Sequence, residues 1–406
     1  MNRGVVKLNV PGDWRDAWLY KGTLLLWSRH GKIFSLSLDR IAKEASRSQY
    51  PGVAAALRYA ILRNDWKVSS AFRELMEVPD IRKAFMGCFD DADGVLEISI
   101  EAEPWEMDGS ENLGYVYDTC IYANRIYQAT SDGLFESLFN PEYSEDLLEL
   151  SQSLDFATFA VTARYMCVNA SAKERGLWFS PVVLGPKNSN STSVDALQVA
   201  DYSAYASFAG RNLLNYTEDR APSFLKAHDV KMRATDNAQY EEYVVTGFDD
   251  EVQIASLAGK AVNSRKKITF DGRSGDDESE QVEVIGNSNH RLLVASGEGV
   301  TVVNIAAFSG SGITMMRDRS FRVPLDSLEA GEILSTSPLK SGFVVEKFDS
   351  VDVVTHHGAF EIYNKPVGRV RTFGKSLRHQ DVVAVTGETS MSLLGFVDFG
   401  DSGPQF

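Results

Sequence analysis

The stretch from Gly114 to Phe139 constrains the fold more than any other part of the chain. It contains three short runs of β-branched and aromatic residues, separated by Ala123-Asn124 and by Ser131-Asp132-Gly133. Runs of this composition favour strands, and the residues between them are turn signals. The stretch therefore predicts an antiparallel meander with strands at Tyr115–Thr119, Arg125–Thr130 and Leu134–Phe139.

The same pattern returns along most of the chain. Residues that anchor the predicted middle strands recur at intervals of roughly 40 to 60 residues, and a repeat of one four-stranded unit needs about 40–45. These anchors are Ile126, Tyr165, Leu213, Val252, Leu292, Val351 and Leu393. A first unit beginning near Asp16 and a partial last unit at Asp381–Phe396 bring the count to eight.

The partial last unit predicts how the repeats close. Its two strands are too few for a four-stranded unit, and the N-terminal run Val5–Asn9 has the composition of a strand that could be added to them. Pairing the two ends of the chain leaves no free sheet edge, which is how repeated β-sheet proteins avoid aggregation. We therefore expect Val5–Asn9 to pair with the strands of Asp381–Phe396 in one sheet.

In repeat length and strand order the chain resembles the β-propeller superfamily, with a WD40-like architecture. The resemblance covers nearly everything outside Ala42–Asp93. It implies an all-β protein, a single propeller over residues 1–406 with seven or eight four-stranded blades, and the repeat count favours eight. The Gly-His…Trp-Asp pair, the Gly-Gly kelch repeat and the sialidase box are absent from the sequence, so the resemblance points to no specific family.

Residues 42–93 break the repeat and are predicted to be an α-helical insertion in the first blade, whose outer strand is expected at Val95–Ile100. Apolar residues recur there at helical spacing. Either this stripe packs on its own blade, or part of it is a docking surface for another chain. The candidate partner-binding residues are Leu57, Ile61, Trp66, Phe72, Met76 and Trp105.

An acid precedes six of the predicted inner strands by one residue. Inner strands line the channel of a propeller, so these carboxylates are expected at its mouth, where they could bind a cation or a basic peptide. Alternatively, each accepts backbone N–H bonds and fixes one blade to the next, and repetition in six units favours this structural role. The six acids are Asp16, Asp155, Asp201, Glu242, Glu283 and Asp381.

Basic and histidine residues lie in the turns between the predicted middle and third strands, on the same face as the acids. They include Lys173, Arg175 and the pair His356-His357. A metal site at the two histidines would need a bent turn, because adjacent strand residues point to opposite faces. Ordinary solvated side chains explain these residues better, so no metal site and no cofactor are predicted.

Composition limits the classes of partner. The net charge of −15 and the pI near 5.0 argue against broad nucleic-acid contacts, which need clustered Lys and Arg. No apolar run has the roughly 18 residues that a membrane span requires. The three cysteines are far apart and form no Cys-x-x-Cys pair, which favours a reduced cytoplasmic setting.

These patterns predict a non-catalytic recognition or scaffold subunit that mediates protein–protein interaction in a cytoplasmic complex. No P-loop, Gly-x-Ser-x-Gly elbow or dinucleotide fingerprint is present. One alternative is a hydrolase or lyase with a carboxylate-lined site at the channel mouth that uses a divalent cation. Another is a sensor subunit of a larger effector.

Overall fold

The chain forms two compact units, of which unit 1 comprises Met1–Asp108, Ser337–Thr355 and Glu361–Phe406, and unit 2 comprises Gly109–Thr336 and His356–Phe360. The computed structural model describes residues 3–398 except 49–50, 63–69, 88, 90–94, 100–103, 108–112, 140–147, 183–195, 218–222, 229–230, 235–240, 246, 254–282, 289–290, 297–298, 310–311, 316–320, 323–332, 341, 356–357, 375 and 377.

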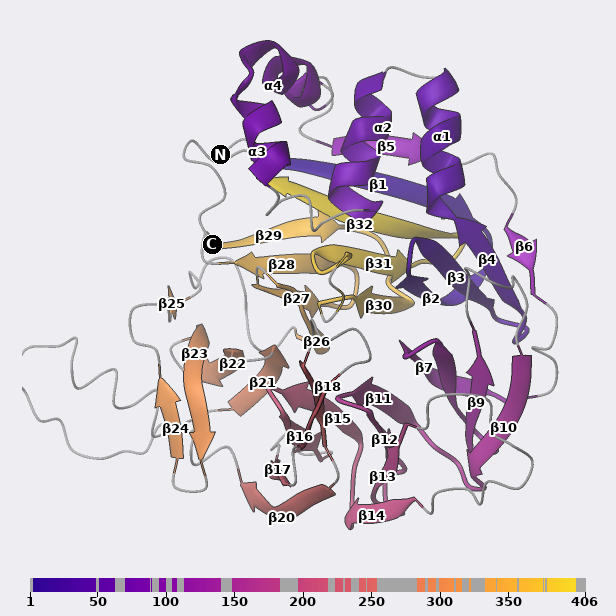
Figure 1. The fold of residues 1–406 in the computed structure, drawn as a ribbon, viewed down its shortest axis with the longest axis vertical. Coiled ribbons are helices and arrows are strands. Elements are labelled where there is room, and N and C mark those ends of the chain that lie inside the picture. The colour runs from indigo at the N-terminus through magenta and orange to yellow at the C-terminus, as the bar shows by residue number, and fades with distance from the viewer. Residues whose placement is uncertain are drawn as a thin grey trace, which may run out of the picture. The chain divides into compact units, whose positions relative to one another are not determined.

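Unit 2 begins with the predicted meander and repeats it (Figure 1). Its first sheet is β7 (Val116–Tyr122), β8 (Arg125–Thr130), β9 (Leu134–Leu138) and β10 (Leu148–Leu154). The second is β11 (Ala160–Arg164), β12 (Cys167–Ser171), β13 (Leu177–Pro181) and β14 (Leu197–Ala200). The third is β15 (Tyr205–Ala209), β16 (Asn212–Tyr216), β17 (Ser223–His228) and β20 (Gly247–Gln253).

The rest of unit 2 is a fourth sheet and a hairpin. The sheet contains β21 (Glu283–Ser288), β22 (Arg291–Ser296), β23 (Gly299–Ser309) and β24 (Gly312–Met315), and β25 (Phe321–Arg322) also pairs with β23. The hairpin is β18 (Lys231–Ala234) and β19 (Glu241–Val244). The inner strands β7, β11, β15 and β21 contact one another in that order.

Unit 1 contains one sheet of β2 (Trp14–Tyr20), β3 (Thr23–Ser28), β4 (Ile33–Ser37) and β6 (Trp105–Glu106). A mixed five-stranded sheet has the order β30 (Arg369–Thr372), β31 (Val382–Thr386), β32 (Ser390–Asp398), β1 (Arg3–Pro11) and β5 (Val95–Ser99). A further sheet is β26 (Ser335–Pro338), β27 (Gly342–Glu346), β28 (Val351–Thr355) and β29 (Gly358–Tyr363). Most of its residues belong to unit 1, whereas Ser335, Thr336 and residues 358–360 belong to unit 2.

Six sheets thus consist of strands that pair in chain order, which is the strand arrangement of a WD40-like β-propeller. The predicted all-β propeller is confirmed, whereas the predicted seven or eight blades are wrong, because the described residues form six such repeats. In the described part of the chain the fifth predicted unit forms no separate blade, since Val252 lies in β20 and pairs with Phe224 as the outer strand of the β15–β17 sheet. The strands of the eighth unit lie in the mixed sheet.

The mixed sheet joins the two chain ends, as expected. Strand β1 pairs antiparallel with β32 from Arg3 opposite Asp398 to Pro11 opposite Ser390. Its other edge pairs in parallel with β5, so the prediction that Val95–Ile100 completes the first blade is wrong. The two-residue strand β6 takes that place beside β4.

Removal of residues 1–11 should strongly destabilise the protein. The truncation exposes an edge of β32 and removes Val6, Leu8 and Val10, whose exposed fractions are 0, 0 and 1%. Burying each aliphatic side chain contributes about 1.5–3 kcal/mol, so we expect a loss of several kcal/mol or no cooperative unfolding. Thermal denaturation followed by circular dichroism measures this, and an unchanged melting temperature would contradict the role of β1.

Helices fill the interval between β4 and β5 (Figure 1). They are α1 (Leu38–Ser48), α2 (Pro51–Leu57), the π-helix η1 (Arg58–Leu62), α3 (Ser70–Glu77) and α4 (Pro79–Met86). Strands β1 and β32 contact η1 within unit 1. Gly395 of β32 permits this approach, because a Cβ there would lie 2.4 Å from the carbonyl oxygen of Ala60.

The first half of the insertion belongs to the core of unit 1. Leu57 and Ile61 are 0% exposed and pack in one apolar cluster with Leu8 and Leu393. The carbonyl oxygen of Ile61 also lies 2.8 Å from Nδ1 of buried His379. The prediction that Leu57 and Ile61 dock another chain is therefore wrong, since the mixed sheet already covers both side chains.

Two isoleucines of the insertion should respond differently to truncation. Ile61→Ala leaves a cavity against the mixed sheet, so we expect a loss of about 2–5 kcal/mol in the free energy of unfolding. Ile81 of α4 is 41% exposed, and Ile81→Ala should change that free energy by no more than about 0.5 kcal/mol. Urea denaturation compares the variants, and equal losses would show that the insertion is not divided in this way.

Candidate functional site

The carboxylate of Asp16 joins two sheets of unit 1. Arg371 of β30 donates from Nε to Oδ1 at 2.8 Å and from Nη2 to Oδ2 at 2.6 Å. The backbone N–H of Ala17 donates to Oδ1 at 2.9 Å, and Asp16 is 3% exposed. A bulge between Trp14 and Asp16 in β2 turns the side chain toward β30. This bidentate, charge-assisted contact fixes the β2 and β30 strands to each other.

Asp118 joins two sheets of unit 2, although the sequence analysis did not select this residue. It follows an equivalent bulge after Val116 in β7, is 4% exposed, and accepts the backbone N–H of Val161 in β11 at 2.8 Å. The first two sheets of unit 2 are therefore fixed at their inner strands by a buried carboxylate. The structural interpretation of the acids is supported at Asp16 and Asp118.

Uncharged side chains make the corresponding contacts between later sheets of unit 2. Asn287 of β21 donates to the carbonyl oxygen of Phe208 in β15 at 3.0 Å and accepts from the Tyr216 hydroxyl at 2.7 Å. Burial, and then the nearby Tyr205, raises the pKa of Tyr216, so its hydroxyl stays a donor. Thr336 donates to the carbonyl oxygen of Ile285 at 2.6 Å.

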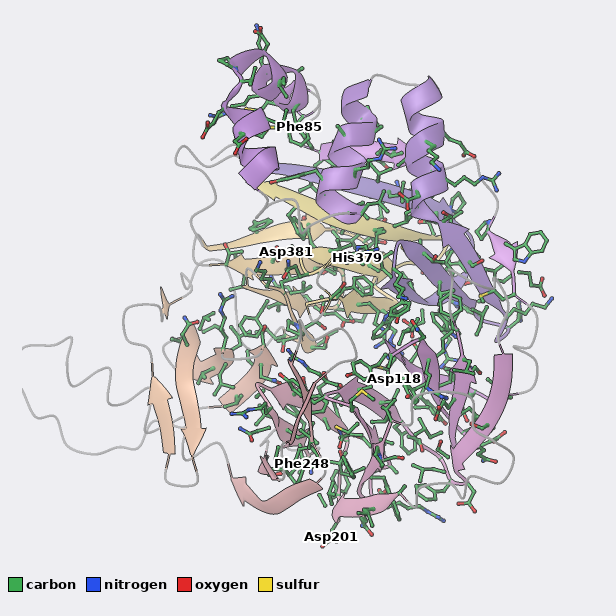
Figure 2. All side chains as sticks on the ribbon, in the orientation of Figure 1. Phe85, Asp118, Asp201, Phe248, His379 and Asp381 are labelled. Atoms are coloured by element: carbon green, nitrogen blue, oxygen red, sulfur yellow. The ribbon has the colours of Figure 1, made fainter. Side chains whose placement is uncertain are left out.

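The six predicted acids do not form one set of equivalent groups. Asp16 and Asp381 are buried, whereas Asp155 and Asp201 are exposed. Figure 2 labels Asp381 and Asp201 beside their separate sheets. Glu242 lies in β19 and Glu283 in β21, and their side chains are outside the described part of the structure. These acids differ because the observed strands begin at other residues than predicted. Asp16 lies inside β2 at a buried bulge, whereas Asp155 and Asp201 lie in the loops that precede β11 and β15.

Asp16→Asn and Asp201→Asn test this difference directly. The first leaves the Arg371 guanidinium without its carboxylate in a buried site, and we expect a loss of about 3–5 kcal/mol. The second changes an exposed side chain and should alter stability by no more than about 0.5 kcal/mol. Urea denaturation measures both, and equal effects would mean that Asp16 and Asp201 have the same role.

Four loops at the same end of the β7–β10 and β11–β14 sheets form a surface that we name the loop face: residues 131–133, 155–159, 172–176 and 201–204. The Thr158 N–H donates to the carbonyl oxygen of Thr130 at 2.9 Å, which ties the second loop to the first. Lys173 and Ser203 exchange backbone hydrogen bonds of 2.8 and 3.1 Å, which tie the third to the fourth. The Phe159 N–H donates to the carbonyl oxygen of Ser171, just before the third loop, at 2.8 Å, so hydrogen bonds connect the four loops to one another.

Local sequence explains the shape of these loops. The Thr130 hydroxyl accepts the N–H groups of Asp132 and Gly133, both at 3.1 Å, and donates to the Gly133 carbonyl oxygen at 3.0 Å. Gly133 has φ +149°, and a Cβ there would lie 2.0 Å from the Leu154 carbonyl oxygen. Only glycine fits this approach of the first loop to β10.

Aromatic rings and cationic side chains of the loop face lie close to one another and to aromatic rings of the adjoining strands β7 and β13. The Phe156 and Trp178 ring centroids are 5.3 Å apart, and those of Tyr117 and Phe159 are 4.9 Å apart. The Arg175 guanidinium lies 5.0 Å from the Phe156 centroid, and the Lys173 ammonium lies 5.0 Å from the Phe159 centroid. The predicted placement of Lys173 and Arg175 on the same face as Asp155 and Asp201 agrees with this arrangement.

An open pocket of about 350 Å³ lies at this end of the two sheets. Asp155, one of the predicted acids, is part of its wall beside Phe156 and Trp178. Indole Nε1 of Trp178 donates to the Arg175 carbonyl oxygen at 2.7 Å, which fixes the orientation of the ring. The complete lining is Gln152, Ser153, Leu154, Asp155, Phe156, Trp178 and Ala196.

The remaining predicted docking residues are not part of the loop face. Trp105 lies in β6 and is 62% exposed, and Met76 of α3 is partly buried against the core of unit 1. Trp66, like His356-His357, lies outside the described residues, as does the side chain of Phe72. In and beside the later helices of the insertion, Leu75, Val78 and Ile81 are exposed.

Sequence reasoning missed Phe156, Phe159 and Trp178 because it considered only the acids before the strands. A signal was present in the sequence: Asp155-Phe-Ala-Thr-Phe159 and Asp201-Tyr-Ser-Ala-Tyr205 share an acid, an adjacent aromatic residue and a second aromatic residue three positions later. Each copy spans the link from one sheet to the next.

Buried polar groups elsewhere in unit 2 have a structural role. Arg125 and Glu136 form an ion pair on adjacent strands, and both residues are buried. Burial, and then the charge of Glu136, raises the pKa of nearby Tyr127, which keeps that phenol neutral. Among the described residues, no group of three or more His, Cys, Asp or Glu side chains is arranged to hold a metal ion.

No described helix is both long enough and apolar enough to cross a bilayer.

No family model matches the chain, and no curated protein matches it. Solved structures with a similar fold include the Neurospora crassa Pan2 WD40 domain, with a TM-score of 0.47 and 9% identity over 97% of this chain and 96% of that one. The WD40 domain of Toxoplasma gondii coronin has a TM-score of 0.44 and 9% identity over 99 and 89%. The AfRom2 CNH domain has a TM-score of 0.36 and 12% identity over 71 and 96%.

Proposed function

We propose that the protein is a non-catalytic recognition subunit of a cytoplasmic complex, and that the loop face of unit 2 binds its protein partner. The observation that carries this proposal is the cluster of partly exposed aromatic rings around an open pocket, held on loops that are hydrogen-bonded to one another. Aromatic and arginine side chains on a rigid support are the residues that contribute most to protein–protein binding.

The separation of structural and exposed polar groups supports a binding role. Asp16 and Asp118 are buried and bonded to neighbouring strands, so they stabilise the sheets. Asp155 and Asp201 are exposed at loops where substitution costs little stability. Such a surface can acquire specificity for a partner without disturbing the fold.

The same separation argues against the hydrolase or lyase alternative. A general acid and a general base must approach one reacting group within hydrogen-bond reach. Of the predicted acids whose side chains are described, two are buried and two lie on separate loops. The pocket wall contains one carboxylate, that of Asp155. Two convergent carboxylates are therefore not found among these residues.

A cytoplasmic location is favoured by the arrangement of the cysteines, which lie far apart in the sequence and form no Cys-x-x-Cys pair. Cys120 and Cys167 are buried in different sheets, in β7 and β12. Proteins of oxidising compartments commonly use paired cysteines as disulfides, whereas cytoplasmic proteins keep their thiols reduced.

Affinity purification of a tagged protein from its own cells tests the proposal. Phe156→Ala combined with Trp178→Ala should reduce a co-purifying partner at least about tenfold, because truncating a hot-spot aromatic residue costs about 2 kcal/mol or more of binding. Phe348→Ala removes a ring that is 83% exposed at another site, and it should leave the partner bound. Quantitative mass spectrometry measures the ratios, and melting temperatures confirm that the variants are folded.

Equal recovery of every partner with the double variant and with wild type would contradict a role for the loop face. Loss of the partner with Phe348→Ala alone would show that the partner binds at the β27–β28 turn instead.

A further inference from the structure

The pocket of the loop face lies between the outer strands of two neighbouring sheets. Residues 152–154 of its wall end β10, and Ala196 immediately precedes β14. Strands β10 and β14 are the outermost described strands of their sheets. An outer strand presents N–H and C=O groups that an extended peptide can pair with. The location therefore favours an extended segment of a partner over a compact small molecule.

The aromatic pair in the pocket already accepts a guanidinium group from the protein itself. Arg175 lies over the Phe156 ring at 5.0 Å, and Trp178 packs against Phe156 with an interplanar angle of 53°. Indole is the best of the natural rings at attracting a cation. The partly exposed ring of Trp178 thus offers a second surface for a cationic side chain.

The charges around the pocket favour a basic ligand. The Asp155 carboxylate is in the wall, and Gln152 of the wall donates to the carbonyl oxygen of Asp132 at 2.9 Å. The four loops contain four exposed acids, Asp132, Asp155, Glu174 and Asp201, and two cationic residues, Lys173 and Arg175. Carboxylates therefore exceed cationic groups locally, in agreement with the net charge of −15 for the whole chain.

We infer that this pocket binds an Arg or Lys side chain of an extended partner segment, with the aliphatic and cationic parts stacked on Trp178 and the charge paired with Asp155. The inference rests on the proposed function, because it names the ligand chemistry of the same loop face. In this binding mode, stacking on Trp178 contributes to the affinity, and the Asp155 carboxylate causes the preference for a positively charged side chain.

Two labelled octapeptides test the inference with the full chain. One is Gly-Ser-Val-Thr-Arg-Thr-Val-Ser, and the other has Gln in place of Arg. Fluorescence anisotropy should give at least about fivefold tighter binding for the Arg peptide, since cation–π and ion-pair contributions favour it. The preference should decrease at high salt, because the charges are exposed.

Three variants separate the pocket from general charge effects. Asp155→Asn should remove most of the preference for Arg over Gln, and Trp178→Ala should weaken binding of the Arg peptide. Asp349→Asn removes an exposed carboxylate on the β27–β28 turn and should leave the preference unchanged. Asp155→Lys, an exposed substitution that spares the core, should reverse the preference toward a peptide with Glu at the central position.

Equal binding of the Arg and Gln peptides, or a preference that survives Asp155→Asn, would overturn the inference. If the Phe156 and Trp178 double variant still loses its partner in the purification experiment, the loop face remains the binding surface and only the basic ligand is wrong. If both experiments fail, the proposed function fails as well.

Discussion

The polar contacts between inner strands of neighbouring sheets are the interactions on which the rest of the structure depends. Asp16 holds Arg371 in unit 1, and Asp118 holds the Val161 backbone in unit 2. Apolar packing between sheets is not directional, so by itself it does not fix how far one sheet slides along the next. A buried carboxylate with directed hydrogen bonds fixes that position, because leaving it unpaired would cost several kcal/mol.

This constraint explains why the loops can differ so much from one another. With the inner strands fixed, the loops at 155–159 and 201–204 need only to link two sheets, and their hydrogen bonds to neighbouring turns keep them ordered. Exposed acids and aromatic rings in these loops cost the fold little. The loop face can therefore carry recognition, while the bulged positions in β2 and β7 carry stability.

The insertion is held in place by apolar packing, whereas directed polar contacts join the repeats. Leu57, Ala60 and Ile61 of the insertion are buried in one apolar cluster with Leu8 and Leu393 of the mixed sheet. The π-helix and Gly395 bring the helix backbone close to β32. Among the described residues of the insertion, the large apolar side chains of Leu75 and Ile81, in α3 and α4, are exposed.

The all-β class and the meander of β7–β9 follow from the sequence, because alternating β-branched runs and turn residues act over short distances. The pairing of β1 with the C-terminal strands was also predictable, because a partial last repeat leaves a sheet edge that needs a partner. The remaining features depend on the tertiary structure. Val252 lies in the outer strand β20, and Val95–Ser99 pairs with β1. Neither pairing was predicted, because burial of shared faces selects strand partners that are far apart in the sequence. Whether an acid such as Asp16 or Asp201 is buried depends on a bulge and on the neighbouring sheet, and neither is encoded within a few residues of the acid.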